Sequence, residues 1–316
     1  MTQSPLHLDR LRLRHFRLLD LIDQHGSLRA VGNAINLTQP AVSQMVKDLE
    51  FALGVNLVER SVRGVTLSAA GQLALQRTRS GVATFEHLAR ELQTGLSPIL
   101  RIGTNPVLLV KLLPSALAKL NVAQSDIRFQ IRTGWVTEMM QTLWDGKLDC
   151  YIGHVNWNQV PLQMASVLRH DALIQTELVI ACSASHPLAQ RKSLSVKDLA
   201  DWPWALPPVG TNIRMVLETG LRNNGLSSPM ASVEIESDPI ALISLAKQVN
   251  LLTCVPRIAI EAHSDAGEIC VLDMPDFTLT GNQIYFVTLA EHEDMDSLNA
   301  MRRAIVDAAG STTKPH

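Results

Sequence analysis

No part of the sequence is apolar for long enough to enter a membrane. The start, MTQSPLHLDRLRLRHF, lacks the apolar run of a secretory signal, and no stretch approaches the roughly 18 apolar residues of a membrane span. Cysteine is scarce: Cys150, Cys182, Cys254 and Cys270 lie far apart with no Cys-x-x-Cys pair, which favours buried free thiols over a disulfide or metal site. We therefore expect a cytoplasmic protein with no membrane partner.

The motifs that carry most enzyme chemistry are missing as well. The sequence contains no Walker loop, no G-x-S-x-G elbow, no G-x-G-x-x-G after a strand, and no His, Asp and Glu cluster at metal-ligand spacing. His263 and Asp265, near Glu261 and Glu268, are typical of a polar loop. These absences predict a protein that is not an enzyme and that uses no cofactor and no metal.

Length and charge indicate a mildly basic head on an acidic body. The 316 residues suffice for two or three domains, and 46% hydrophobic residues can fill sizeable cores. Residues 1–95 hold 11 Lys and Arg against 8 Asp and Glu, whereas residues 96–316 hold 17 against 22. This distribution permits, without requiring, a phosphate-binding surface on the N-terminal part.

The N-terminal part has the pattern of three helices and a hairpin. Gly26 and Asn36 end the first two helices, and Thr38 is placed to cap a third. Pro40 lies in its first turn, where a missing N–H does no harm. The segment ERSVRGVTLS follows as two short strands joined by a turn. We therefore predict a winged helix-turn-helix domain, mostly α-helical, over residues 1–66.

The third helix has one apolar face and one small, polar face. Val42, Met45, Val46 and Leu49 recur at steps of three and four. A helix whose other face is small and polar fits the major groove of DNA, where base edges form hydrogen bonds, although a plain solvated surface has the same composition. The predicted DNA-binding residues are Thr38, Gln39, Pro40, Ala41, Ser43, Gln44 and Lys47 on this helix and Arg63 at the hairpin tip.

Residues 67–97 predict a long linker helix followed by a hinge. The stretch contains no proline before the hinge, and apolar side chains alternate steps of three and four at Val82, Phe85, Ala89, Leu92 and Leu96. Such a heptad seam predicts that the helix pairs with its counterpart in a second copy of the chain. The alternative is that the seam packs on its own domain.

Strand-like and helix-like segments alternate over residues 98–316. ILRIGT, PVLLVKLLPSALAKL, IRFQIRT and VTEMMQTLWDGK are examples, and the alternation predicts a mostly parallel sheet covered by helices. The strands are too many for one small sheet. We therefore predict two α/β subdomains, the first over about 98–172 plus 276–316 and the second over about 173–275.

One segment, HGSLRAVGNAINLTQPAVSQMVKDLEFALGVNLVERSVRGVTLSAAGQLAL, resembles the head of the LysR-type transcriptional regulators. The segments GKLDCYIG, HPLA and LLTCVP extend the resemblance along the chain, so it is strong over residues 10–75 and diffuse afterwards. The sequence departs from the family at Val31-Gly32, where Ala and a larger residue are common. NLLTCVP also lacks the glycines that often precede that loop.

The resemblance implies both a fold and a function. Proteins of this family bind a double-stranded DNA operator through the winged head, pair through the linker helix and commonly form homotetramers. Their effector domain is similar to bacterial periplasmic binding proteins: a small-molecule effector enters between two α/β subdomains and changes how the DNA is bent. RNA polymerase is left open as a further partner.

Polar residues at strand ends indicate where an effector binds. Ligands of open α/β sheets lie beyond the carboxyl ends of strands and at helix N-termini. Helix caps and ordinary packing are the alternatives for each position. The predicted effector-binding residues are Thr104, Asn105, Thr133, Trp135, His154, Thr211 and Asn212, with Thr253 and Val255 added by the resemblance alone.

The pattern of threonine, asparagine and helix N-termini favours a small organic acid as effector, and Trp135 favours an aromatic one. One other function remains open: an architectural DNA-binding protein without an effector would share the head. A transport-type binding protein would share the body, but it fits neither the head nor the missing signal peptide. Whether a ligand changes DNA binding distinguishes a regulator from an architectural protein.

Overall fold

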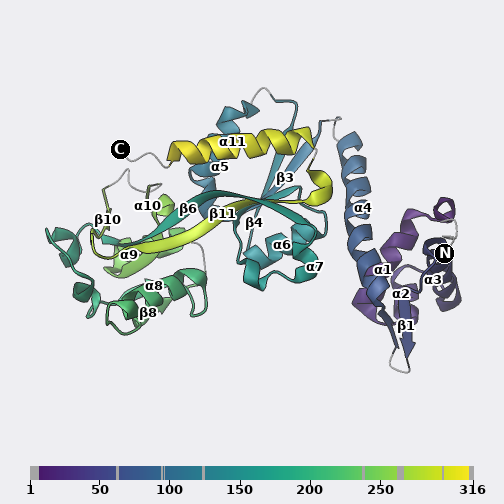
Figure 1. The fold of residues 1–316 in the computed structure, drawn as a ribbon, viewed down its shortest axis with the longest axis horizontal. Coiled ribbons are helices and arrows are strands. Elements are labelled where there is room, and N and C mark those ends of the chain that lie inside the picture. Colours follow the sequence, from purple (N-terminus) through teal and green to yellow (C-terminus); the bar gives the residue numbers. More distant parts are fainter. Residues whose placement is uncertain are drawn as a thin grey trace. The chain divides into compact units, whose positions relative to one another are not determined.

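The computed structural model describes residues 7–61, 64–93, 95, 97–122, 125–236, 239–261, 267–293 and 295–312. The chain divides into two compact units: Met1–Ile99 with Gln141–Leu148, and Leu100–Met140 with Asp149–His316. Figure 1 shows the elements of both units. Each unit is described by itself.

The first unit begins with three helices and a hairpin, after a single 3-10 turn, η1 (Leu8–Arg10). Figure 1 shows these elements together, in colours from purple to dark blue. They are α1 (Leu13–His25), α2 (Leu28–Ala34), α3 (Gln39–Leu53), β1 (Val58–Ser61) and β2 (Gly64–Leu67). The strands β1 and β2 pair antiparallel, so the predicted helix-turn-helix with its wing is present.

Side-chain caps and backbone turns place these helices as the sequence predicts. The Ser27 hydroxyl accepts a hydrogen bond from the Ala30 N–H, and the Thr38 hydroxyl accepts one from the Ala41 N–H. Between α2 and α3, Asn36 adopts a positive φ of 55°, which asparagine tolerates better than most residues. The apolar face of α3 is buried at Val42, Met45, Val46, Leu49 and Ala52.

Gly32 explains one departure from the family pattern. A Cβ added to Gly32 would lie 2.6 Å from the Leu37 carbonyl oxygen, and this approach is fixed because the Leu37 N–H donates to the Gly32 carbonyl at 2.9 Å. Only glycine leaves room for so close a backbone contact. The turn before the third helix is therefore tighter than a larger residue would allow.

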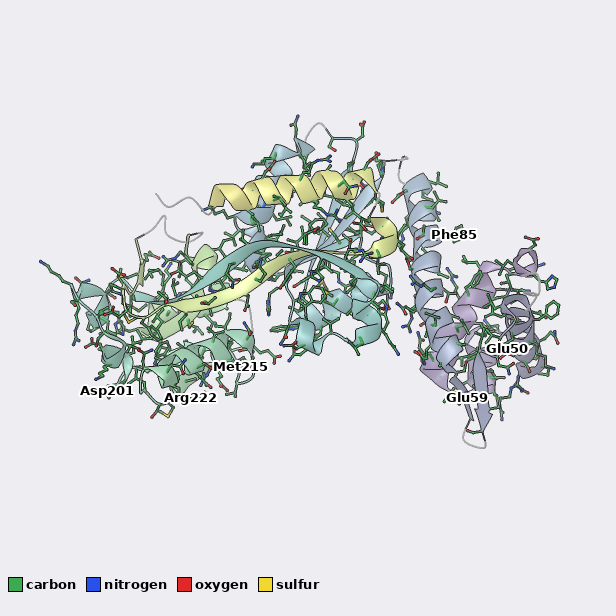
Figure 2. All side chains as sticks on the ribbon, viewed as in Figure 1. Glu50, Glu59, Phe85, Asp201, Met215 and Arg222 are labelled. Atoms are coloured by element: carbon green, nitrogen blue, oxygen red, sulfur yellow. The ribbon has the colours of Figure 1, made fainter. Side chains whose placement is uncertain are left out.

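A single long helix, α4 (Ala69–Gln93), follows the hairpin. In the C-terminal half of this helix three large apolar side chains are exposed: Phe85 at 59%, Leu88 at 49% and Leu92 at 58%. Their spacing of three and four puts them on one stripe of the helix. Figure 2 labels Phe85 on this helix. Leu96, the last residue of the predicted seam, lies outside the described residues.

The second unit is an α/β domain. The helices wholly within it are α5 (Leu112–Lys119), α7 (Leu162–Ala165), α8 (Asn212–Asn223), α9 (Pro239–Val249), α10 (Arg257–Glu261) and α11 (Asp296–Thr312). The division between the units falls within α6 (Val136–Trp144), after Met140. Short 3-10 turns are η2 (Pro106–Leu109), η4 (Trp157–Gln159), η5 (Pro187–Gln190), η6 (Val196–Leu199) and η8 (Ala290–His292).

Its strands form one nine-stranded sheet within the described residues, in the order β4-β3-β5-β11-β6-β9-β7-β8 with β10 paired to β6. They are β3 (Ile99–Thr104), β4 (Arg128–Thr133), β5 (Cys150–His154), β6 (Leu168–Ser183), β7 (Trp204–Leu206), β8 (Ala231–Glu234), β9 (Leu252–Pro256), β10 (Ile269–Val271) and β11 (Leu279–Leu289).

The sheet is mixed, so the prediction of a mostly parallel sheet was wrong. β3 and β5 are parallel, as are β7 with β8 and with β9. The long strand β11 runs antiparallel to both β5 and β6, and β6 runs antiparallel to β9 and β10. The physical reason is the path of the chain. β6 carries the chain away from the strands β3, β4 and β5, and β11 brings it back to them, so β6 and β11 run in opposite directions (Figure 1).

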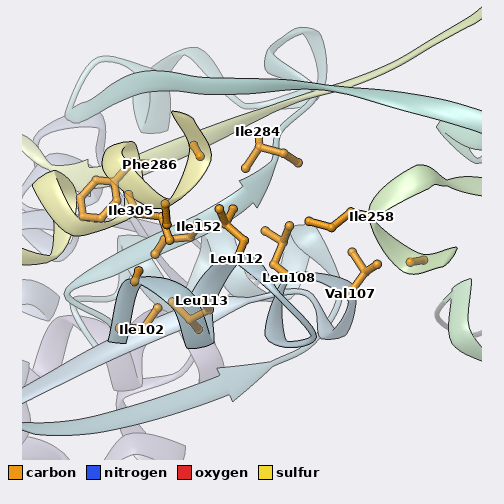
Figure 3. Packing of buried hydrophobic residues seen from close by; sticks show 14 of the residues in the cluster. Ile102, Val107, Leu108, Leu112, Leu113, Ile152, Ile258, Ile284, Phe286 and Ile305 are labelled. Carbon is orange, nitrogen blue, oxygen red and sulfur yellow. The ribbon is translucent and has the colours of Figure 1, made fainter. Parts of the chain in front are cut away.

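The core lies on both faces of this sheet. One cluster of buried residues contains Ile102, Leu112, Ile152, Phe286 and Ile305, and α11 packs there beside α5 (Figure 3). A second cluster lies under α8 and includes the fully buried Trp204. From Leu178 to Cys182 on β6 the side chains alternate between the two clusters, as a strand segment buried on both faces requires.

The cysteines are all free. Cys150, Cys182 and Cys254 are buried, whereas Cys270 is half-buried. Burial raises the pKa of the Cys254 thiol to about 12. Trp202 packs partly buried against the second core cluster. The predicted polar loop at His263 and Asp265 lies outside the described residues.

Candidate functional site

The helix α3 exposes a small, polar face. Gln39, Pro40, Gln44 and Lys47 are exposed, and Ala41 and Ser43 are partly exposed. Thr38 is exposed at the start of the helix, where its hydroxyl already caps the first turn at 3.4 Å from the Ala41 nitrogen. The structure thus brings all the predicted positions on this helix to one accessible surface. Arg63 lies outside the described residues.

Two residues of this surface were missed by the sequence analysis. Arg60 on β1 donates a hydrogen bond from Nη2 to the Ser43 hydroxyl at 3.1 Å, which adds a guanidinium to the face of α3. The Gln44 amide donates to the Asp48 carboxylate at 2.8 Å. Asp48 follows Gln44 by four residues, a spacing visible in the sequence. The Arg60 contact depends on how the wing packs and has no local signal.

Glu50 fixes the wing against α3. One of its carboxylate oxygens accepts hydrogen bonds from the Leu57 and Val58 N–H groups, at 2.8 and 3.2 Å. Figure 2 labels Glu50 on α3 and Glu59 on the adjoining strand β1. A charge-assisted bond to two backbone donors is stronger than a neutral one. These bonds hold the start of β1 against α3, and Arg60 lies two residues further along the same strand.

The second unit contains a cavity of about 440 Å³. This volume lies within the range of small-molecule sites. Val107, Leu108, Ile258 and Ile284 belong both to its lining and to the first core cluster (Figure 3). The cavity thus has an apolar floor. Of the predicted effector-binding residues, the lining contains Asn105, Thr133, Trp135, His154, Thr211 and Asn212.

Three predicted residues do not line this cavity. Thr104 is fully buried and donates its hydroxyl to the Ile152 carbonyl at 2.8 Å. Thr253 and Val255 are also fully buried, on β9. Because side chains alternate along a strand, both of them point into the core. Pro256 and Ile258, just beyond that strand, reach the cavity instead.

One residue caps the 3-10 turn η2, which contributes Val107 and Leu108 to the cavity lining. Asn105 alone caps η2, a single 3-10 turn, and its side-chain oxygen accepts from the Leu108 N–H at 3.3 Å. Thr104 does not cap this turn, because its hydroxyl donates to the Ile152 carbonyl. Across the cavity, Thr211 is the N-cap residue of α8, but its hydroxyl donates to the Pro208 carbonyl at 2.8 Å.

The sequence analysis missed three polar lining residues, Thr176, Glu236 and Asn282. Thr176 donates its hydroxyl to the Asn282 carbonyl at 2.8 Å, and the Asn212 amide donates to the Asn282 side-chain oxygen. Thr176 and Asn282 lie within the paired strands β6 and β11, where the register is irregular between Thr280 and Gln283. Only the pairing of the two strands brings these residues together.

His154 is the titratable group of the cavity wall nearest to β11. Its Nδ1 lies 3.4 Å from the Gln283 carbonyl oxygen. Burial lowers the pKa of His154, and the hydrogen bond to Gln283 acts in the opposite direction. With its pKa below the usual value of about 6.5, the ring is neutral at pH 7.

The charge of the lining is one-sided. Among its described residues the cavity has no Lys or Arg, while Glu236 contributes a carboxylate. An expected carboxylate effector would therefore meet only neutral donors there. Elsewhere in the described part of the chain, no group of three His, Cys, Asp or Glu side chains is placed to hold a metal ion. The helices of the described residues also include none that could cross a bilayer.

Family models match both units. The model of the LysR substrate binding domain matches residues 93–310, and that of the bacterial regulatory helix-turn-helix protein, lysR family, matches residues 13–72. The chain is 28% identical to the transcriptional regulator GbpR of Azospirillum brasilense, over 83% of this chain and 77% of that protein. It is also 28% identical to the SDS degradation transcriptional activation protein of a Pseudomonas species, over 96% and 97%.

Solved structures share the fold. A variant of full-length OxyR from Pseudomonas aeruginosa matches with a TM-score of 0.61 at 18% identity, over 94% of this chain and 95% of that one. ArgP from Mycobacterium tuberculosis matches with a TM-score of 0.62 at 17% identity, over 95% and 98%. At these identities the likeness extends to the fold alone.

Proposed function

Because the chain belongs to the LysR family of transcriptional regulators and carries the family's effector-binding domain, we propose that it binds an operator in a sequence-specific manner and that a small molecule modulates this binding and the bending of the DNA. The observation that carries the proposal is the accessible polar face of α3, joined by Arg60 of the wing. A rigid helix with such a face fits the major groove.

In this proposal α3 enters the groove and the wing contacts the backbone. Gln39, Ala41, Ser43 and Gln44 face the base edges, and Lys47 contacts phosphate. Thr38 and Pro40 present the first turn of the helix, and Arg63 at the hairpin tip reaches phosphate or the minor groove. Arg60 joins the set because it already holds the Ser43 hydroxyl.

The domain organisation is proposed as the sequence predicts it. Residues 1–66 bind DNA, residues 67–97 link and dimerise, and residues 98–316 bind the effector. The exposed stripe of α4 supports pairing of two chains, and further contacts build a homotetramer. The regulator works in the cytoplasm, and RNA polymerase is a further partner on the DNA.

The effector site is the cavity of about 440 Å³ in the second unit. It has an apolar floor and a polar rim from several strands and helix ends, as small-molecule sites commonly do. A ligand shifts DNA binding only through its differential affinity for two conformations. Cavity-lining residues on both β6 and β11 support such coupling, because these two strands lie in the middle of the sheet.

The DNA-binding part is tested by alanine replacement on α3. Ser43→Ala and Gln44→Ala should each weaken binding to the operator by about 1–3 kcal/mol per good base contact and leave binding to random DNA unchanged. Gln24→Ala, an exposed glutamine on α1, is the matched control. Wild-type operator affinity in both α3 variants would contradict the groove assignment.

The effector part is tested by blocking the cavity. Thr133→Trp places a large side chain at an exposed lining position, whereas Thr137→Trp places it four residues away, exposed but outside the lining. In a DNase footprint of the operator across a library of small organic molecules, only Thr133→Trp should abolish the ligand response. A wild-type footprint that no ligand changes would favour the architectural alternative.

A further inference from the structure

We propose that the cavity selects an effector whose apolar body carries hydrogen-bond donors, a hydroxyl or a protonated amine, in preference to a carboxylate. The inference rests on the proposed function, since it specifies the ligand class of the same cavity. It follows from the charge of the lining and from which polar atoms are already engaged.

The charge of the lining disfavours an anion. A carboxylate in a partly desolvated site is best held by Arg or Lys, and the described lining contains neither. Glu236 contributes a negative charge of its own. The first turn of α8 begins at Asn212 and offers backbone N–H groups, which favour an anion only modestly. The Glu236 carboxylate opposes that preference.

Two threonine hydroxyls of the lining already donate their protons to backbone carbonyls. Thr176 donates to the Asn282 carbonyl and Thr211 donates to the Pro208 carbonyl, both at 2.8 Å. Each hydroxyl has a single proton but two lone pairs. Both oxygens can therefore accept a hydrogen bond from a ligand, and neither can donate one without breaking its present bond.

His154 adds a third acceptor. A carbonyl oxygen can only accept, so the contact between Nδ1 and the Gln283 carbonyl places the proton of the neutral ring on Nδ1. The lone pair is then on Nε2. Because burial lowers the pKa of this histidine, the ring keeps that lone pair at neutral pH.

The rest of the lining fits an apolar body. The non-polar part of the lining includes Val107, Leu108, Trp135, Ile213, Ile258 and Ile284. Trp135 is 54% exposed, so its ring has an open face for a ligand to stack on. A ligand with an aliphatic or aromatic skeleton buries itself here, while its hydroxyl or amine meets Thr176, Thr211, His154 or Glu236.

The test uses matched probes on the full-length protein. Each set has one carbon skeleton with a different end group, for example 2-phenylethanol, 2-phenylethylamine and phenylacetate, alongside aliphatic sets of similar size. Ligands that bind the folded state raise its melting temperature. We expect the alcohols and amines to raise the melting temperature of the wild type and of Thr137→Trp, and to leave that of Thr133→Trp unchanged. In the wild type, the rise with an alcohol or amine should be larger than the rise with the matched acid.

A charge variant separates the two donor classes. Glu236→Gln should weaken an amine by about fivefold, the effect of losing one exposed ion pair, and leave the alcohol unchanged. If the acids bind best and Thr133→Trp abolishes their binding, the ligand class is wrong while the effector site stands. If no set binds to wild type, both the ligand class and the effector site are overturned.

Discussion

The apolar stripe on α4 leads to the sharpest prediction about assembly. Phe85 and Leu92 are 59% and 58% exposed and are separated by seven residues, with Leu88 between them at 49%. Seven residues is the heptad repeat at which one helix contacts its partner in a coiled coil. Replacing Phe85 and Leu92 together by alanine should therefore weaken dimerisation without unfolding the protomer.

The size of the effect follows from the exposed fractions. Full burial of a large apolar side chain contributes about 1.5–3 kcal/mol. Because these two are more than half exposed, pairing gains roughly 1 kcal/mol for each of them. The double variant removes two such side chains from each protomer, four in the dimer. The free energy of dimerisation therefore weakens by about 4 kcal/mol, and the dimer Kd rises about a thousandfold.

Sedimentation across a dilution series measures this directly. Leu73→Ala is the matched control, since Leu73 lies on the same helix with the same 59% exposure but off the stripe of Phe85 and Leu92. The double variant should dissociate at concentrations where wild type and the control remain associated. Unchanged association of the double variant, or equal weakening by Leu73→Ala, would refute pairing through this stripe.

Three further predictions concern stability. Gly32→Ala should lower the free energy of unfolding by about 1–3 kcal/mol in urea titrations, despite the higher helix propensity of alanine, because the new methyl would lie 2.6 Å from the Leu37 oxygen; a stabilised variant would contradict this. Thr104→Val should lower the free energy of unfolding by about 1–3 kcal/mol, because the buried Ile152 carbonyl loses the hydrogen bond that the Thr104 hydroxyl donates. The response of the operator footprint to ligand should be unaltered. Burial lowers the pKa of His186, so the unfolded chain binds more protons than the folded one as the pH falls below about 6.5, and the free energy of unfolding drops there. In urea titrations between pH 7.5 and 5.5, His186→Asn should reduce this drop. An equal drop in the variant and the wild type would refute the role of His186.

The sequence by itself determined the DNA-binding head, because the signals there are local. Ser27 and Thr38 cap helices whose first turns begin within a few residues. Val42, Met45, Val46 and Leu49 are buried at the predicted spacing. Caps and helical periodicity act over one or two turns, so they depend little on the rest of the chain. The polar face of α3 follows from the same periodicity.

Strand direction lay beyond what the sequence determines. Alternating strand and helix segments predict an α/β domain, and this domain has a nine-stranded sheet over its described residues. The composition of β11 does not reveal that it runs antiparallel to its neighbours β5 and β6. That direction is set by the long return of the chain, which no local pattern encodes.

The cavity was predictable only at strand and helix ends. Asn105 follows β3, Thr133 ends β4 and Thr211 precedes α8, so their positions could be inferred. Thr104 lies one residue earlier, where the alternation of side chains turns it into the core. A shift of one residue along the chain, from Thr104 to Asn105, is therefore the difference between a side chain in the core and one that lines the cavity.

Tertiary pairing alone decided the remaining contacts. Thr176 and Asn282 are separated by 106 positions and meet because β6 and β11 pair with an irregular register. Arg60 reaches Ser43 because Glu50 holds the wing against α3. In both cases the partners lie on different elements, and a sequence carries the propensity of each element but not the packing energy that joins them.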